Sequence, residues 1–194
     1  MAISIIGQQI EVREVLLRDK PPSMLELSPK GTVPVLLLNS GEVIDESLDV
    51  IDWALNINDP EDWKRSNQSK KASVLIETND NEFKHHLDRY KYSKRYDNED
   101  PIIHREKCLV FIDALEEQLK ISKFLHDEKV SALDISILPF IRQFRIADMN
   151  WFDSLNKPKI QSWLMNFLES ELFKGIMFKY EKWEESDEKV FFPN

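Results

Sequence analysis

Cysteine is almost absent from this sequence of 194 residues, in which Cys108 is the only one. A single cysteine excludes an internal disulfide and is typical of a protein kept in a reducing compartment. Histidine is also scarce, and the four residues are His85, His86, His104 and His126. None of them has the spacing to a second set of ligands that a structural metal site requires, so we predict no metal site.

The sequence also lacks an excess of positive charge and any long hydrophobic run. Lys and Arg number 26 against 35 Asp and Glu, which gives a formal net charge of −9. The most basic stretch, residues 84–95, also contains Asp88 and aromatic residues, so we interpret it as a solvated helix face. No stretch has the length of a membrane span, and the N-terminal "MAISIIG" is too short for a secretory signal. We expect a cytoplasmic protein that binds neither nucleic acid nor membrane.

The first part of the chain contains a series of short β-strand signals. "EVREVLL" at residues 11–17 mixes apolar and charged residues like a half-buried strand. "VPVLLL" at 33–38 is a continuous apolar run, typical of a strand buried on both faces. "NSG" is a turn signal, and "EVID" at 42–45 then predicts the returning strand of a β-hairpin. A helix is predicted to begin near Glu46.

The rest of the chain shows helical periodicity only. One apolar face repeats at the spacing of a helix through Cys108, Ile112, Leu115 and Leu119. We therefore predict that Cys108 is a core residue rather than a reactive thiol.

A helix start is marked by "VSALDI" at residues 130–135. Ser131 suits the N-cap position, and Asp134 three residues later forms an acidic variant of the capping box. We predict that a buried helix opens at Ser131.

The change of pattern divides the chain into domains. The stretch "NINDPEDWKRSN" is polar and contains Pro60, which is typical of a linker. We predict an α/β domain over residues 1–57, a linker over 58–66 and an all-helical domain over 67–194.

Two blocks of sequence together resemble the glutathione transferases. The first is "KPPSMLELSPKGTVPVLLLNSGEVIDESLDVIDWAL" at 20–55, and the second is "SALDISILPF" at 131–140. The order of elements is similar to the cysteine-using branch of that family, close to the omega-type transferases and the two-domain glutaredoxins. The resemblance implies a glutathione-transferase-like fold: an α/β thioredoxin-like N-terminal domain, here incomplete, followed by an all-α C-terminal domain.

The resemblance also implies glutathione as co-substrate and a set of residues that bind it. In that family the bond equivalent to Val33–Pro34 is cis, and the backbone of Val33 pairs with the cysteine part of glutathione. Glu46 and Ser47 at the helix start suit the α-ammonium and α-carboxylate of the γ-glutamyl group. Lys20 matches a position that reaches the glycyl carboxylate. Without the resemblance, Pro34 would be an ordinary trans proline at a strand edge, and Glu46-Ser47 a simple helix N-cap.

A second substrate is expected to bind beside the first helices of the helical domain. Polar residues interrupt an apolar face there, and the candidate contacts are Asn79, Phe83, His86 and Tyr90. The alternative is that the polar members are hydrogen-bonded residues within an interface.

The reactive residue of the family is expected on a first strand and turn that lie before residue 1. "MAISIIG" corresponds to the end of the first helix, because Gly7 and the strand at 11–17 follow it. In that family the missing strand lies between the strand at 11–17 and the Pro-led strand, so both would lose a hydrogen-bonded neighbour. We expect this chain to have little or no transferase activity, and weak glutathione binding or none.

Three functions stay open. The first is an enzyme that conjugates or transfers thiols with glutathione in its full-length form, acting on an unknown electrophile or disulfide. The second is a non-catalytic protein of this fold that binds a partner protein or peptide. The third is a thiol–disulfide oxidoreductase of the two-domain glutaredoxin kind. The resemblance favours a homodimer.

Overall fold

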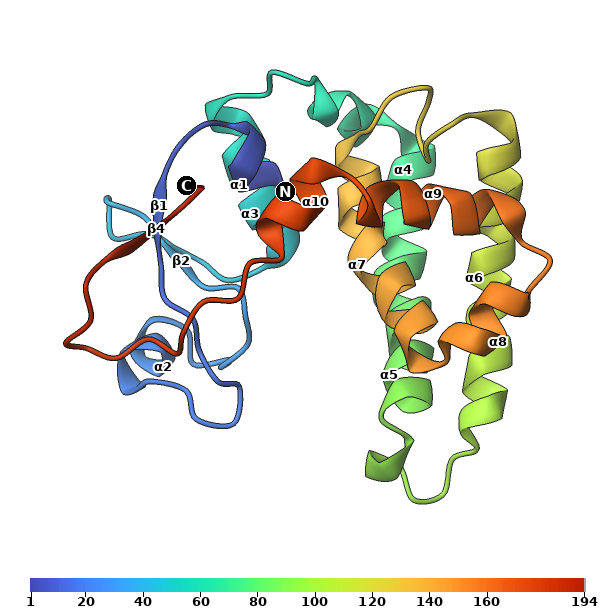
Figure 1. Cartoon of the computed structure of the whole chain (residues 1–194), viewed down its shortest axis with the longest axis horizontal. Coiled ribbons are helices and arrows are strands. Elements are labelled where there is room, and N and C mark those ends of the chain that lie inside the picture. Colours follow the sequence, from blue (N-terminus) through green and yellow to red (C-terminus); the bar gives the residue numbers. More distant parts are fainter. Residues whose placement is uncertain (194) are drawn as a thin grey trace. The chain divides into compact units, whose positions relative to one another are not determined.

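The computed structural model describes residues 1–193 and divides the chain into two compact units (Figure 1). Unit 1 comprises Met1–Glu61 together with the segment that starts at Glu171, and unit 2 comprises Asp62–Ser170. Within the described residues, unit 1 contains the strands and unit 2 is entirely helical. The division differs from the predicted domains chiefly at the C-terminal end, which groups with the first part of the chain.

Unit 1 is a mixed α/β unit with two small antiparallel sheets. In chain order its elements are α1 (Ala2–Ile5), β1 (Ile10–Val12), α2 (Pro22–Leu27), β2 (Leu36–Leu37), β3 (Val43–Ile44), α3 (Ser47–Ile57), α10 (Glu171–Ile176) and β4 (Val190–Phe192). β2 and β3 form the hairpin that the turn signal predicts, with Leu36 opposite Ile44. α1 packs on α3, and the buried residues there form a small core: Ala2, Ile6, Val50, Ala54 and Leu55.

The second sheet pairs β1 with β4, two strands from opposite ends of the sequence (Figure 1). Just before β4, Trp183 donates its backbone N–H to the Glu14 carbonyl oxygen at 2.9 Å. The neighbouring Lys182 ammonium lies 2.6 Å from the Asp19 carboxylate. These contacts hold the C-terminal segment in unit 1, which corrects the prediction of a helical domain that runs to residue 194.

Both predicted strands of the first part are shorter than their sequence signals. The strand at 11–17 is reduced to β1, and only Leu36 and Leu37 of the run at 33–38 are strand residues. Leu37 is 51 % exposed, which contradicts the prediction of a strand buried on both faces. β2 is moreover a strand with a free edge, since β3 is its single neighbour among the described strands. Two-stranded sheets are only marginally stable alone, so unit 1 depends on its helices for a core.

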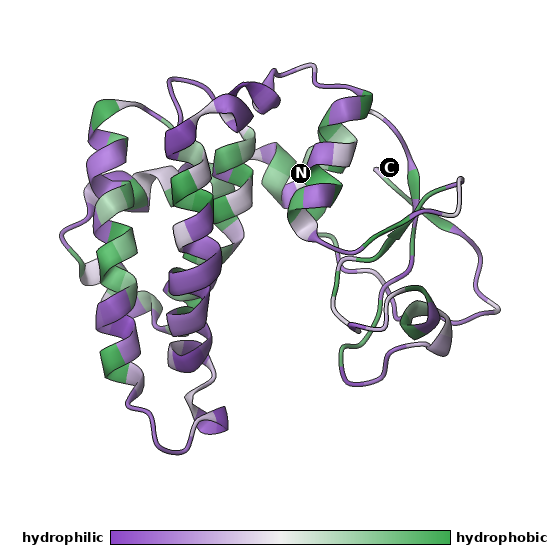
Figure 2. Ribbon diagram, turned by 180° about the vertical axis from the view of Figure 1, so that it is seen from behind, coloured by the Kyte–Doolittle hydropathy of each residue, from purple (hydrophilic) through white to green (hydrophobic). Residues whose placement is uncertain are grey.

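Unit 2 is all-helical, as its periodicity predicts. Its elements are η1 (Trp63–Gln68), α4 (Lys70–Thr78), the π-helical turn η2 (Asn79–Phe83), α5 (Lys84–Lys91), η3 (Ser93–Arg95), α6 (Pro101–Ile121), α7 (Ala132–Ala147), α8 (Met149–Ser154) and α9 (Pro158–Leu168). Figure 2 shows hydrophobic and hydrophilic residues alternating along these helices, as amphipathic helices require. The predicted face of α6 is buried, since Cys108, Ile112, Leu115 and Leu119 are each at most 5 % exposed.

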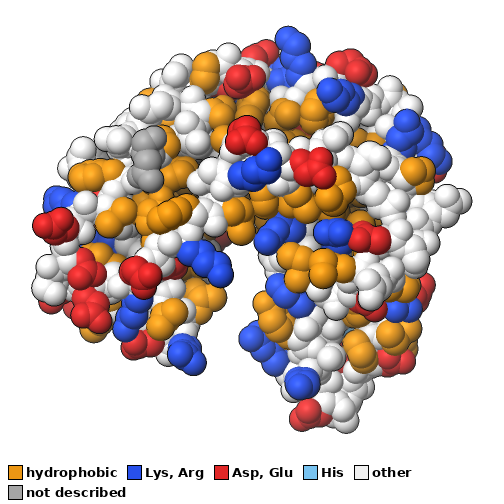
Figure 3. All heavy atoms as spheres, in the orientation of Figure 1, with side chains coloured by type: hydrophobic (Ala, Val, Ile, Leu, Met, Phe, Trp, Pro, Cys, Tyr) orange, Lys and Arg blue, Asp and Glu red, His pale blue; other side chains and the backbone are white. Residues whose placement is uncertain are grey.

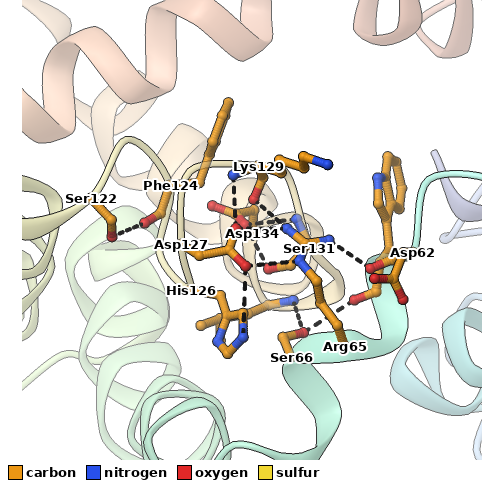
Figure 4. Close-up of polar contacts among 12 residues, drawn as sticks. Asp62, Arg65, Ser66, Ser122, Phe124, His126, Asp127, Lys129, Ser131 and Asp134 are labelled. Carbon is orange, nitrogen blue, oxygen red and sulfur yellow. Dashed lines mark hydrogen bonds and ion pairs between the residues drawn. The ribbon is translucent and has the colours of Figure 1, made fainter.

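The start of unit 2 is anchored, which corrects the prediction of a linker up to residue 66. Trp63 is 3 % exposed and therefore part of the core. Arg65 donates to both carboxylate oxygens of Asp127 at 2.8 Å, and to the Lys129 carbonyl oxygen at 2.7 Å (Figure 4). Hydrogen bonding from the Arg65 guanidinium holds the pKa of Asp127 well below its usual range. The first turn of unit 2 is thus fastened to the loop before α7.

Asp134 organises the start of α7 (Figure 4). Its buried carboxylate accepts hydrogen bonds from the Ser131 N–H and hydroxyl, the Leu125 N–H and the Trp163 indole N–H, all within 3.0 Å. Ser131 and Asp134 form the predicted capping box, which confirms that a buried helix begins here. Burial raises the pKa of Asp134, although these hydrogen bonds act to lower it. One carboxylate therefore connects α7, the loop before it and α9.

Figure 3 shows charged side chains of both signs scattered among uncharged and hydrophobic groups over the visible face. None of the helices within residues 1–193 combines the length and apolar character needed to cross a membrane. In the same part of the chain, no group of three or more His, Cys, Asp or Glu side chains could hold a metal ion.

Candidate functional site

The loop that leads into β2 contains the Val33–Pro34 peptide bond, which is cis as predicted. Gly31 precedes it with a φ of +63°, a left-handed conformation that glycine adopts without strain. Val33 is 50 % exposed, and its N–H and carbonyl groups form no hydrogen bond with another described residue. Exposed backbone groups that are unpaired can pair with an extended peptide.

α3 begins without a side chain that caps its first N–H groups. Glu46 is the N-cap residue, and its side chain forms no capping hydrogen bond. Val50 donates its N–H to the Glu46 carbonyl oxygen at 3.0 Å, so the N–H groups of Ser47, Leu48 and Asp49 have no intrahelical acceptor. These groups and the positive end of the helix dipole suit a carboxylate. Glu46 and Ser47 are both exposed and accessible to a ligand.

Lys30 is a residue of this site that the sequence reasoning missed. Its ammonium lies 2.9 Å from Asp45 Oδ1 and 2.6 Å from Glu46 Oε1. Asp45 in turn accepts a hydrogen bond from the buried Ser28 hydroxyl at 2.7 Å. Hydrogen bonds to Glu46 and then to Asp45 raise the pKa of Lys30 to about 12. The only local signal for Lys30 is its place in the "SPKG" turn before Val33, and that signal is too common to single it out.

Lys20 lies beside the same loop. A methyl group placed on Gly31 would lie 3.7 Å from the Lys20 Cδ, so the stem of Lys20 runs alongside the glycine. Its ammonium forms no hydrogen bond or ion pair with the residues that the structure describes. The structure therefore brings Lys20 to the loop before Val33 with its charge available to an anion.

The four residues predicted to contact a second substrate lie in unit 2, along η2 and α5. Phe83 is only 1 % exposed, and its ring packs on Phe111 and Phe144 with centroids 5.0 and 5.6 Å apart. This position corrects the prediction for Phe83, which is a core residue and not a ligand contact. Phe83 lies in the core because it belongs to an apolar face that repeats at helical spacing.

The other three residues have different surroundings. Asn79 is buried in the π-helical turn, and its Oδ1 has no hydrogen-bond partner within residues 1–193, although Nδ2 donates to Asp80. Such turns are frequent at functional sites. Tyr90 lies in an aromatic cluster, and burial raises the pKa of its hydroxyl. His86 contacts His104.

Cys108 is fully buried, as its place on the apolar face of α6 predicts. Burial raises the pKa of its thiol to about 12. The thiolate is the reactive form of cysteine, so this thiol is unreactive at neutral pH.

The first part of the chain matches a known family of domains. Residues 1–63 match the family model described as "Glutathione S-transferase, N-terminal domain". The chain is 28 % identical over 166 residues to "Glutathione S-transferase DHAR3, chloroplastic" of Arabidopsis thaliana, an alignment that covers 84 % of this chain. The chain spans 60 % of the length of that curated relative.

Solved structures of glutathione transferases have the same fold. A family member from Pseudomonas fluorescens, solved with two glutathione bound, has a TM-score of 0.74 at 14 % identity, covering 89 % of this chain and 83 % of its own. A glutathione transferase from Pseudomonas putida, solved with one glutathione disulfide per subunit, has a TM-score of 0.71 at 18 % identity, covering 89 % and 82 %. At such identities the likeness concerns the fold, and it confirms the predicted thioredoxin-like domain followed by a helical domain.

Proposed function

We propose that this chain, of which residues 1–63 match the N-terminal domain model of the glutathione S-transferases, is a member of that family and binds glutathione on unit 1. The proposal rests on two features of unit 1 that occur together. The Val33 backbone, before the cis proline, is exposed and unpaired, and the N-terminus of α3 is uncapped. The first suits an extended peptide, and the second suits a carboxylate. Together they fit a tripeptide that carries an α-amino acid group at one end.

Each part of glutathione is assigned to one group of the site. The cysteine part pairs with the backbone of Val33, which precedes Pro34. The γ-glutamyl α-carboxylate lies against the free N–H groups and hydroxyl of Ser47 at the start of α3, and its ammonium lies against Glu46. The glycyl carboxylate lies against the ammonium of Lys20.

The affinity of this site is expected to be weak. Glu46 is already paired with Lys30, so a ligand ammonium has to share this carboxylate or displace the lysine. The segment around Val33 leads into a strand of two residues in a two-stranded sheet, which orders it poorly. A dissociation constant on the order of 1 mM, or about 4 kcal/mol of binding free energy, is consistent with these features.

For the complete activity, we propose glutathione conjugation or thiol transfer to an electrophile or disulfide. Asn79, His86 and Tyr90 stay proposed as contacts of that second substrate. Cys108 does not supply a thiolate, which argues against a glutaredoxin-like reaction of this chain by itself. Binding without catalysis is the second candidate function. The proposal includes a cytoplasmic location and a homodimer.

The test is the replacement of Glu46 by glutamine, which keeps the shape of the side chain and removes its charge. Losing a charge-assisted hydrogen bond to the ligand ammonium should weaken glutathione binding about tenfold. Binding is measured by calorimetric titration at millimolar ligand. Glu42→Gln, an exposed change on the β2–β3 hairpin, serves as the matched control and should leave the affinity unchanged. Equal affinities of the Glu46 and Glu42 variants would refute the assignment of Glu46.

A further inference from the structure

Two histidines meet where α5 packs against α6. His86 Nδ1 lies 2.8 Å from His104 Nδ1. His104 is buried, and its other ring nitrogen lies 2.7 Å from the carboxylate of Glu99. Glu99 belongs to the segment 92–100 that joins the two helices, and it also pairs with Arg89 of α5 at 2.8 Å. A chain of polar contacts thus connects α5, α6 and the segment between them.

The geometry limits how many protons this chain of contacts can hold. A carboxylate oxygen of Glu99 lies 2.7 Å from His104 Nε2, which favours the tautomer of neutral His104 with its proton on Nε2. The Nδ1 atom of His104 then carries a lone pair that can accept from His86 Nδ1–H. One added proton is tolerated, because charged His104 can form an ion pair with Glu99 and donate from Nδ1 to a neutral His86 whose hydrogen has moved to Nε2. When both rings are charged, two N–H groups face each other 2.8 Å apart and the hydrogen bond is lost.

The charges around His86 oppose its protonation. On α5 it faces His85 and Arg89, and on α6 it faces His104 and Lys107. Glu99 of the connecting segment is the acidic group in this cluster, and it contacts His104 rather than His86. Burial first, and then repulsion from the cationic forms of His85 and His104 and from Lys107 and Arg89, lower the pKa of His86 below the ordinary value of 6.5.

We propose that His86, His104 and Glu99 form a proton-sensitive latch, which holds the end of α5 and the segment 92–100 against α6 while at most one imidazole is charged. A second proton turns His86 away from His104 toward solvent. The end of α5 and the connecting segment then loosen from α6, with the rest of unit 2 still folded around its aromatic core.

The sign of the pH dependence follows from the lowered pKa of His86. A base whose pKa is lower in the folded state than in the unfolded state stabilises the fold above the unfolded value, about 6.5, and this contribution is lost as the pH falls below it. The ratio of unfolded to folded molecules is therefore expected to rise several-fold as the pH falls from about 7.5 to about 5.

The test compares the wild-type chain with His86→Asn by urea unfolding at these two pH values. Asparagine can donate to His104 but does not titrate. The ratio of unfolded to folded molecules should therefore rise several-fold less in the His86→Asn variant than in the wild type. His126→Asn, on the loop before α7, is the matched control and should behave like the wild type. An equal pH dependence in His86→Asn and wild type would overturn the latch.

A second measurement needs no variant. In an NMR pH titration of the wild-type chain, the backbone amides of residues 92–100 should shift with the same midpoint as the His86 ring, below about 6.5. Amide shifts that follow another midpoint, or no shift in this segment as His86 titrates, would also overturn the latch.

Discussion

Replacing Asp134 with alanine is expected to lower the free energy of unfolding of unit 2 by about 3–5 kcal/mol, because each buried donor left without an acceptor costs about 1–3 kcal/mol. The carboxylate accepts four hydrogen bonds, and the Trp163 indole N–H and the Leu125 N–H would remain buried without it. The change also removes the capping box of α7. Urea unfolding followed by far-ultraviolet circular dichroism measures the loss.

Asp113→Ala is the matched control for this prediction. Asp113 lies on the exposed face of α6 with 54 % of its side chain accessible and pairs with Lys157. Exposed ion pairs contribute about 0–1 kcal/mol, so the control should remain close to the wild type. Similar losses in the two variants would mean that the Asp134 network does not organise unit 2.

Replacing Phe83 with alanine is the second change with a large expected effect. The side chain is fully enclosed by its neighbours, including Phe111 and Phe144, so its removal should cost about 3–5 kcal/mol of unfolding free energy. Phe83→Leu retains most of the volume and should lose less. Phe178→Ala is the control, because it makes the same replacement in unit 1 at a position that is 62 % exposed.

This prediction separates a core role from a ligand role for Phe83. If the residue lies in the core, Phe83→Ala destabilises unit 2 strongly. If it lined a substrate site instead, the variant would keep its stability and lose only the binding of the second substrate. A loss of less than about 1 kcal/mol would contradict the packing of Phe83 against Phe111 and Phe144.

Local signals in the sequence predicted several features correctly because the interactions that produce them are local. The capping box at Ser131 and Asp134 lies within one helical turn. The burial of Cys108 follows from a face that repeats every three or four residues. The β2–β3 hairpin follows from a turn signal between two short apolar runs.

Features that depend on distant segments were not predictable in the same way. The pairing of β1 with β4 joins opposite ends of the sequence, and no periodicity in either strand indicates its partner. The length of a strand depends on how many neighbouring strands it pairs with. The strand lengths predicted from continuous apolar runs were therefore too long. The prediction for Phe83 failed because an apolar helical position looks the same in the core and in a binding site.

The candidate glutathione site was predicted by resemblance and not by local patterns. The cis bond before Pro34 is confirmed, whereas the roles of Lys20, Val33, Glu46 and Ser47 stay predictions. The ion pairs of Lys30 depend on the return of the hairpin to the start of α3, so they appear only in three dimensions.

Glutathione binding by unit 1 is proposed to take place between the Val33 loop and the start of α3. The most direct test is a ¹H–¹⁵N NMR titration of the 194-residue chain with reduced glutathione. Binding at this site predicts saturable shifts of the Val33 amide and of the amides at the start of α3, Ser47 to Asp49, with a dissociation constant on the order of 1 mM. Saturable shifts confined to unit 2, or no shifts at these amides at tens of millimolar ligand, on the order of ten times that constant, would contradict it.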